Sequence, residues 1–136
     1  LGEIESVFQG ETTGKLALVV DDDQDARELV SRALKSIGMD VEVAENGAEA
    51  LKKVHHNLNL IVLDLSMPVM DGFEFLNEFN ELKLSPSPQV VIFSGMSLDD
   101  TLKETLSNVH AGVIDKNDKG VGQKIRQLAR ELSAEA

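Results

Sequence analysis

The stretch that decides the fold runs from Leu60 to Gly72 and reads LIVLDLSMPVMDG. Four apolar residues lead directly into Asp64, a pattern typical of a strand that is buried on both faces of a parallel sheet. A carboxylate inside such a strand would be costly, so Asp64 is expected where the strand ends. Ligands of open α/β sheets bind at that carboxyl end. Pro68 and the pair Asp71-Gly72 predict a stiff, turn-containing loop beside Asp64.

Apolar runs that stop at polar residues recur along the chain, and each is followed by apolar residues at helical spacing. Asp23 is a plausible N-cap and Gly38 a plausible C′ residue of the first helix. Five such repeats predict an α/β, flavodoxin-like fold: a doubly wound five-stranded parallel sheet of order 2-1-3-4-5, with five helices on both faces. Strands are predicted at residues 16–20, 40–44, 60–63, 89–93 and 112–114, and helices at 26–37, 47–57, 73–82, 98–106 and 121–132.

Length and composition indicate one globular domain. Residues 1–14 show no clear period and are expected to form a tail or linker, which leaves 15–136 as the domain. The chain starts at Leu1 without methionine, so a fragment or processed form is expected. A net charge of −11 argues against nucleic acid and anionic lipid as direct partners. The absence of cysteine suits a cytoplasmic location, and no apolar run reaches the roughly 18 residues that span a membrane.

Polar side chains follow four of the predicted strands, and each has an ordinary explanation when taken alone. The run Asp21-Asp22-Asp23 could cap a helix, Ser94-Gly95 could form a turn, and Lys116 could be a solvated lysine. In a sheet of order 2-1-3-4-5, however, these strand ends and Asp64 meet in one crevice. The sequence therefore predicts that carboxylates, a hydroxyl and an ammonium share a pocket.

The predicted pocket has the chemistry of phosphoryl transfer. Clustered carboxylates raise each other's pKa unless a cation lies among them, and a few oxygens with room for water suit Mg²⁺. No cysteine or nearby histidine points to zinc. Lys116 and Ser94 can then meet an anion on the far side of the metal, while an aspartate is a competent nucleophile toward phosphorus. We expect phosphate to be transferred onto Asp64.

The chain resembles the receiver domain of bacterial two-component response regulators over about residues 15–133. The segments that carry the resemblance are Leu18 to Asp23, Leu63 to Gly72, Val91 to Gly95, and Lys116. The resemblance implies that Asp64 accepts phosphate from a histidine kinase or a phosphotransfer protein. It implies that Asp21, Asp22, Asp64 and the backbone carbonyl of Ser66 hold Mg²⁺. It also implies that Ser94 and Lys116 engage the phosphoryl group, and that the change passes to a downstream protein through the fourth helix, fifth strand and fifth helix.

The sequence departs from the family pattern at three positions. Asn117 follows the lysine where the family usually has a proline in a cis peptide, so a cis bond is not expected here. Val113 replaces the aromatic residue that often acts as a switch ring. Ser94 stands where threonine is commoner. Phe93, the last residue of the fourth predicted strand, is expected to belong to the core.

Two other functions remain open from sequence alone. An aspartyl-phosphate phosphohydrolase usually has a second acid two residues after the nucleophile, but Ser66 stands there. A docking module of the same shape that never carries phosphate is the other alternative, and the full set of site residues counts against it. We favour a signalling module that is not an enzyme toward outside substrates. The resemblance to receiver domains also implies that Ser66 and Met96 flank the path of the hydrolytic water. Both orient water poorly, so slow self-dephosphorylation is expected.

Overall fold

The computed structural model describes residues 14–55, 57–67, 69–95 and 112–134. Five parallel strands form one sheet in the order β2-β1-β3-β4-β5, as predicted. The strands are β1 (Leu16–Val20), β2 (Asp40–Ala44), β3 (Leu60–Leu63), β4 (Gln89–Ser94) and β5 (Gly112–Asp115). The helices are α2 (Gln24–Ser36), α3 (Gly47–Lys53), α4 (Gly72–Leu82) and α6 (Val121–Ala134).

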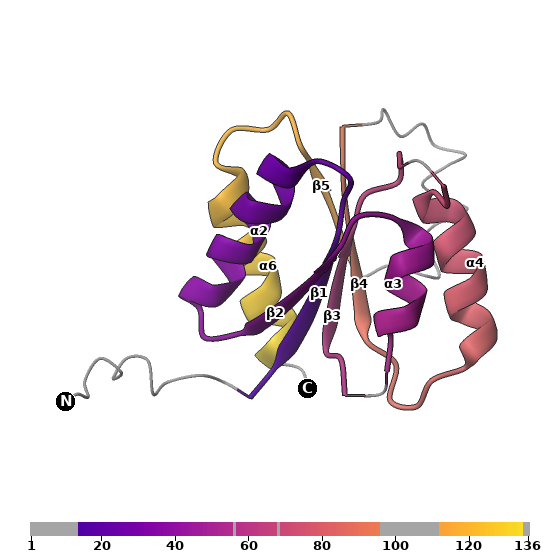
Figure 1. Ribbon diagram of the computed structural model, residues 1–136. Helices are drawn as coiled ribbons and strands as arrows, with labels where there is room; N and C mark the ends of the chain where they lie inside the picture. Colours follow the sequence, from indigo (N-terminus) through magenta and orange to yellow (C-terminus); the bar gives the residue numbers. More distant parts are fainter. Residues whose placement is uncertain (1–13, 56, 68, 96–111, 135–136) are drawn as a thin grey trace.

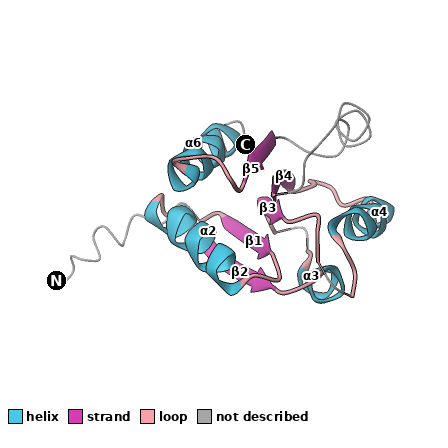
Figure 2. Ribbon diagram, turned by 90° about the horizontal axis from the view of Figure 1, so that it is seen from above, coloured by secondary structure: helices cyan, strands magenta, loops and turns pink. Residues whose placement is uncertain are grey.

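The helices cover both faces of the sheet (Figures 1 and 2), with α2 and α6 on one side and α3 and α4 on the other. Alternation along β1 explains the two layers, because successive side chains of a strand point to opposite faces. Ala17 and Val19 belong to the core under α2 and α6, whereas Leu18 and Val20 belong to the core under α3 and α4. No helix in the described ranges is both long and apolar enough to cross a membrane.

Most predicted boundaries agree with the structure to within two residues. Asp23 is the N-cap of α2 and accepts a hydrogen bond from the backbone N–H of Asp25, and Gly38 has a φ of 90° just past the helix end. Four helices lie in the described part of the chain. The fifth, predicted over 98–106, falls outside the described residues.

The helix predicted over 47–57 is shorter than expected and ends at Lys53. Val54 leaves the helix with extended backbone, at a ψ of 131°. The chain then turns, because the N–H of Leu58 donates to the carbonyl of His55, and Leu58 is buried at 2% exposure. Burying Leu58 in the core outweighs the weak helical propensity of the segment that precedes it.

Candidate functional site

Backbone hydrogen bonds between neighbouring strands continue just past the strand ends and fix where the site residues begin. The N–H of Asp21 donates to the carbonyl of Ala44, and the N–H of Asp64 donates to the carbonyl of Val20. The N–H of Lys116 donates to the carbonyl of Ser94 in the same way, at 3.0 Å. The sheet therefore delivers residues from four strand ends to one edge, as the sequence predicted.

Three carboxylates gather at this edge. Asp21, Asp22 and Asp64 each offer an oxygen within 4.8 Å of the others. Asp21 and Asp64 are 1% and 4% exposed, whereas Asp22 faces solvent. Two buried carboxylates this close together need a cation, because like charges in a poorly solvated site repel each other strongly.

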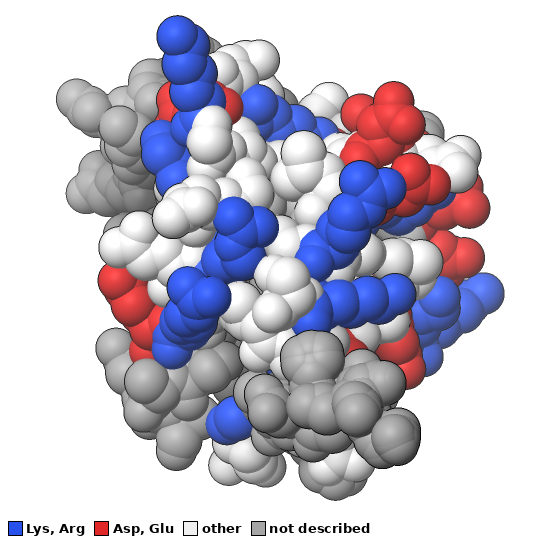
Figure 3. Space-filling model, turned by 90° about the vertical axis from the view of Figure 1, so that its left-hand side faces the viewer, with Lys and Arg blue, Asp and Glu red and all other residues white. Residues whose placement is uncertain are grey.

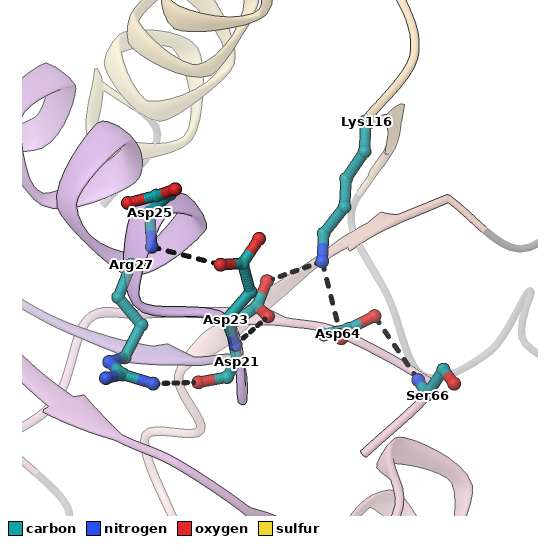
Figure 4. Close-up of polar contacts among 7 residues, drawn as sticks. All are labelled: Asp21, Asp23, Asp25, Arg27, Asp64, Ser66 and Lys116. Carbon is teal, nitrogen blue, oxygen red and sulfur yellow. Dashed lines mark hydrogen bonds and ion pairs between the residues drawn. The ribbon is translucent and has the colours of Figure 1, made fainter.

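Lys116 supplies one positive charge to this cluster (Figure 4). Its Nζ lies 2.8 Å from Oδ2 of Asp21 and 3.4 Å from Oδ2 of Asp64. The lysine side chain is 23% exposed, so the ammonium reaches from the rim into the pocket. The prediction that a lysine after the fifth strand would meet the acidic cluster is confirmed by these distances.

The pKa values of Asp21 and Lys116 reflect both burial and the neighbouring charges. Burial raises the pKa of Asp21, the charge of Asp64 raises it further, and hydrogen bonds from Lys116 and the Asp23 backbone oppose the rise. Burial alone would lower the pKa of Lys116, but the hydrogen bond and charges of Asp21 and Asp64 outweigh it, so its pKa is raised. The lysine therefore stays charged at neutral pH, while the positive charge of Lys116 does not fully offset the burial of Asp21.

The donor set fits a hard divalent cation. Oδ2 of Asp21 is buried, and among the described residues its close partner is the ammonium of Lys116, 2.8 Å away. Oδ1 of Asp21 already accepts from the N–H of Asp23, at 3.0 Å. A buried carboxylate oxygen that shares one ammonium with a second carboxylate, beside an exposed carboxylate, is the kind of oxygen ligand that Mg²⁺ prefers.

The loop after Asp64 is fastened to the sheet by close backbone contacts. The N–H of Ser66 donates to Oδ1 of Asp64 at 3.2 Å, so Ser66 sits directly beside the carboxylate (Figure 4). A Cβ on Gly72 would lie 2.5 Å from the carbonyl oxygen of Asp64, and a Cβ on Gly47 would lie 2.7 Å from that of Met70. Glycine is needed at both positions because the opposing atoms are backbone that cannot swing away.

The structure also locates the remaining predicted residues. Ser94 ends β4 and is 3% exposed. Val113, at the position of the usual switch ring, is 43% exposed. Among the described residues the cis peptide is Ser85-Pro86, so the bond from Lys116 to Asn117 is trans, as expected. Met96 lies outside the described residues.

Two contacts at the site were not anticipated from the sequence. Arg27, on the first turn of α2, donates from Nη1 to the carbonyl oxygen of Asp21 at 2.8 Å (Figure 4). Phe93 is in the core as predicted, at 4% exposure, but the Nζ of Lys116 also lies 5.5 Å from its ring centroid. Arg27 follows Asp21 by six residues, so its side chain can reach back over the first turn of the helix to the Asp21 carbonyl. This spacing was the signal in the sequence that could have predicted the contact.

A comparison with known protein families agrees with the geometry and the motifs. The sequence model described as "Response regulator receiver domain" matches residues 17–125. The chain belongs to this family. Receiver domains are signalling modules of two-component systems.

Individual relatives support the assignment. A transcriptional regulatory protein, the CpxR homolog of Haemophilus influenzae, is 44% identical over 118 residues, which are 86% of this chain and 51% of that protein. A protein-glutamate methylesterase of Syntrophomonas wolfei is 34% identical over 113 residues, or 80% of this chain and 31% of that protein. The receiver domain thus spans about half the length, or less, of these curated relatives.

Solved structures give the same fold. The chemotaxis protein CheY4 of Vibrio cholerae superimposes with a TM-score of 0.74 at 25% identity, covering 87% of this chain and 98% of CheY4. The likeness extends over nearly the whole of a protein named for chemotaxis.

Proposed function

We propose that this receiver domain is a phosphoacceptor in a two-component phosphorelay and that Asp64 takes the phosphoryl group from a histidine kinase or a phosphotransfer protein. The observation that carries the proposal is the placement of the Asp64 carboxylate. It lies at a strand end, almost fully buried, beside two further carboxylates and 3.4 Å from an ammonium. A cytoplasmic location accords with a chain that contains no cysteine.

The proposed reaction is a direct displacement at phosphorus. A carboxylate oxygen of Asp64 forms the new bond to phosphorus, and the bond from phosphorus to the donor breaks, with its electron pair leaving on the donor. Positioning and charge stabilisation account for most catalysis of this kind. Lys116 already contacts the Asp64 carboxylate. Its ammonium can therefore stabilise the negative charge that develops on the phosphoryl oxygens during transfer.

The same proposal assigns a magnesium site to the carboxylate cluster. Asp21, Asp22 and Asp64 would hold the ion, with the backbone carbonyl of Ser66 as a further oxygen. When bound, Mg²⁺ would neutralise charge on the phosphoryl oxygens. The Arg27 side chain would keep the Asp21 backbone in place by its hydrogen bond to that carbonyl.

We propose that the signal leaves the site through Ser94. Its hydroxyl would bind the acquired phosphoryl group, and its backbone already joins β4 to Lys116 at the end of β5. A downstream protein would read the change on the fourth helix of the sequence, on β5 and on α6. That fourth helix, predicted over 98–106, lies outside the described residues.

The face formed by α2 and α6 favours an acidic phosphodonor surface. Figure 3 shows lysine and arginine side chains gathered on this face. The two helices carry six basic and three acidic residues, a net charge of +3, although the whole chain carries −11. A hollow of about 560 Å³ lies between them, and Arg32 and Arg126 line it together with the acidic side chains of Asp25 and Glu28. Complementary charge would steer a partner to this face beside Asp64.

The direct test is phosphorylation by a small donor. Acetyl phosphate with Mg²⁺ should add one phosphoryl group to the protein, detected by intact mass spectrometry. Asp64→Asn should abolish the label, because an amide is no nucleophile here. Asp71→Asn, a helix N-cap on the same loop, is the matched control and should retain the label.

The same experiment separates the alternatives. A label that persists in Asp64→Asn would refute the assignment of the acceptor. An unlabelled parent protein would favour a docking module that works without phosphate. Steady turnover of a small phosphate ester, with release of many equivalents of phosphate, would favour a phosphohydrolase instead.

A further inference from the structure

The ammonium of Lys116 has a third neighbour besides its two carboxylates. Its Nζ lies over the ring of Phe93, 5.5 Å from the centroid, which is within the range of a cation–π interaction. At the same time Nζ remains 2.8 Å from Asp21 and 3.4 Å from Asp64. The ammonium is therefore held between an acidic side and an aromatic side.

The ring of Phe93 is itself firmly placed. Phe93 lies in β4, is 4% exposed, and pairs in register with Ile114 of β5. Its side chain belongs to the core cluster that includes Ile114 and Val121, on the α2 and α6 face of the sheet. One residue later, the carbonyl of Ser94 accepts the backbone N–H of Lys116. Ring and lysine are thus tied together by both the core and the strand ladder.

We infer that Phe93 is a positioning residue for phosphoryl transfer, its ring holding the Lys116 ammonium at the phosphoacceptor. This rests on the proposed function, in which Lys116 meets the phosphoryl group. A lysine has a long side chain with many rotamers, and confining it costs conformational entropy. A fixed ring beneath the ammonium restricts that freedom before the donor arrives.

The ring has a property that the two carboxylates lack. The carboxylate oxygens of Asp21 and Asp64 are also available to a metal ion. When a divalent cation binds these oxygens, the attraction of the two carboxylates for Lys116 weakens. An aromatic face does not compete for Mg²⁺, which prefers oxygen ligands. Phe93 therefore still attracts the ammonium when the carboxylates are occupied, which is when transfer takes place.

The test is a double-mutant cycle on the phosphorylation rate, measured with acetyl phosphate at fixed Mg²⁺. Phe93→Leu should slow phosphorylation about two- to fivefold, the range expected for a partly exposed cation–π contact. Phe93→Tyr keeps an aromatic face and should restore most of the rate. In a Lys116→Ala background, Phe93→Leu should cause no further slowing, because the ring acts through the lysine.

A structural role for Phe93 predicts a different pattern. Phe93→Leu would then slow the reaction equally in both backgrounds, and that result would overturn the inference, as would an unchanged rate in the parent background. Phe79→Leu removes a core ring from the opposite face of the sheet and is the matched control, for which no dependence on Lys116 is expected. A parent protein that takes no phosphate would instead refute the proposed function.

A second measurement does not depend on catalysis or on the stability of the variants. An aromatic ring shifts the NMR signals of protons above its face upfield. The ε-methylene protons of Lys116 should therefore resonate upfield in the parent and in Phe93→Tyr, and return to ordinary lysine values in Phe93→Leu. Identical shifts in the parent and in Phe93→Leu would show that the ring does not hold the lysine.

Discussion

The 2.8 Å ion pair between Lys116 and Asp21 joins the ends of two strands that are not neighbours. Asp21 follows β1 and Lys116 follows β5, with β3 and β4 between them in the sheet. Oδ2 of Asp64, after β3, lies 3.4 Å from the same ammonium. The charge needed to hold two buried carboxylates together thus comes from the far edge of the sheet, and the response of this cluster to metal and to pH can be predicted from that arrangement.

Magnesium is expected to stabilise the fold, because it adds positive charge to the carboxylate cluster. If the site binds with a dissociation constant of about 1 mM, about 10 mM Mg²⁺ should raise the unfolding free energy by about 1.4 kcal/mol by mass action. Asp22→Asn should abolish this gain. Asp40→Asn, an exposed acid at the start of β2, is the control and should preserve it. Thermal melts with and without Mg²⁺ measure the effect, and equal melting temperatures in the parent would disprove it.

In the metal-free protein, the contribution of Asp21 to the unfolding free energy should fall as pH rises from acid toward neutral. Burial raises the folded-state pKa of this carboxyl above its ordinary value of 3.8. Between 3.8 and the raised pKa, the folded state therefore binds more protons than the unfolded state, and the unfolding free energy falls as pH rises through this window.

Asp21→Asn tests this linkage, since the amide stays neutral at every pH. Urea unfolding of both proteins in EDTA, over a series of pH values, gives the difference in unfolding free energy. That difference should move in favour of Asp21→Asn as pH rises through the window. A difference that is independent of pH would show that burial of Asp21 has no net effect on its ionisation.

Much of the fold followed from local patterns in the sequence. The apolar run from Leu60 to Leu63 predicted a fully buried strand, and all four residues are buried. The same reasoning placed Asp64 and Lys116 at strand ends, and their meeting followed from the strand order, since the carboxyl ends of parallel strands share one edge. These features depend on hydrophobic patterning and strand order, which can be predicted from a single sequence.

Other features depend on tertiary contacts that leave no local pattern. Val69 adopts a φ of 69° although β-branched residues rarely do, because the loop is fastened on either side by the contacts of Asp64 and Gly72. The early end of α3 reflects burial of Leu58. The position of Phe93 beneath Lys116 requires knowing how β4 and β5 align, which the sequence alone did not give.

Gly72→Ala should destabilise the protein and slow phosphorylation. A Cβ at this position would lie 2.5 Å from the carbonyl oxygen of Asp64 and 2.7 Å from Cα of Leu65, so the acceptor loop must shift. Overpacking of this kind costs about 1–3 kcal/mol. Gly122→Ala is the control, because the neighbour that its Cβ would meet in the described part of the chain is Nη1 of Arg126, at an ordinary 3.6 Å.

The control should be neutral or stabilising by up to about 1 kcal/mol, since alanine is the better helix former. Urea unfolding and the rate of labelling by acetyl phosphate report the two effects. If Gly72→Ala matched the parent in both, the close approach of the loop to Asp64 would not matter for either folding or transfer.

The phosphate on Asp64 is expected to be long-lived, with a half-life of minutes to hours. Hydrolysis requires a water in line with the bond between Asp64 and phosphorus, and positioning dominates such reactions. Ser66 lies beside the carboxylate, with its N–H donating to Oδ1 of Asp64, but its side chain is short and exposed. Met96, which lies outside the described residues, offers only a weak thioether acceptor.

The double variant Ser66→Asn with Met96→Glu should place groups that orient water and speed hydrolysis several-fold. A factor of ten corresponds to only about 1.4 kcal/mol of barrier, so a modest gain in positioning suffices. Phosphate release at fixed Mg²⁺ measures both proteins. The competing view is that the intrinsic lability of an acyl phosphate sets the rate, in which case the two half-lives would be the same. A parent half-life of seconds would also contradict the expectation. Water would then attack quickly although neither Ser66 nor Met96 orients it well.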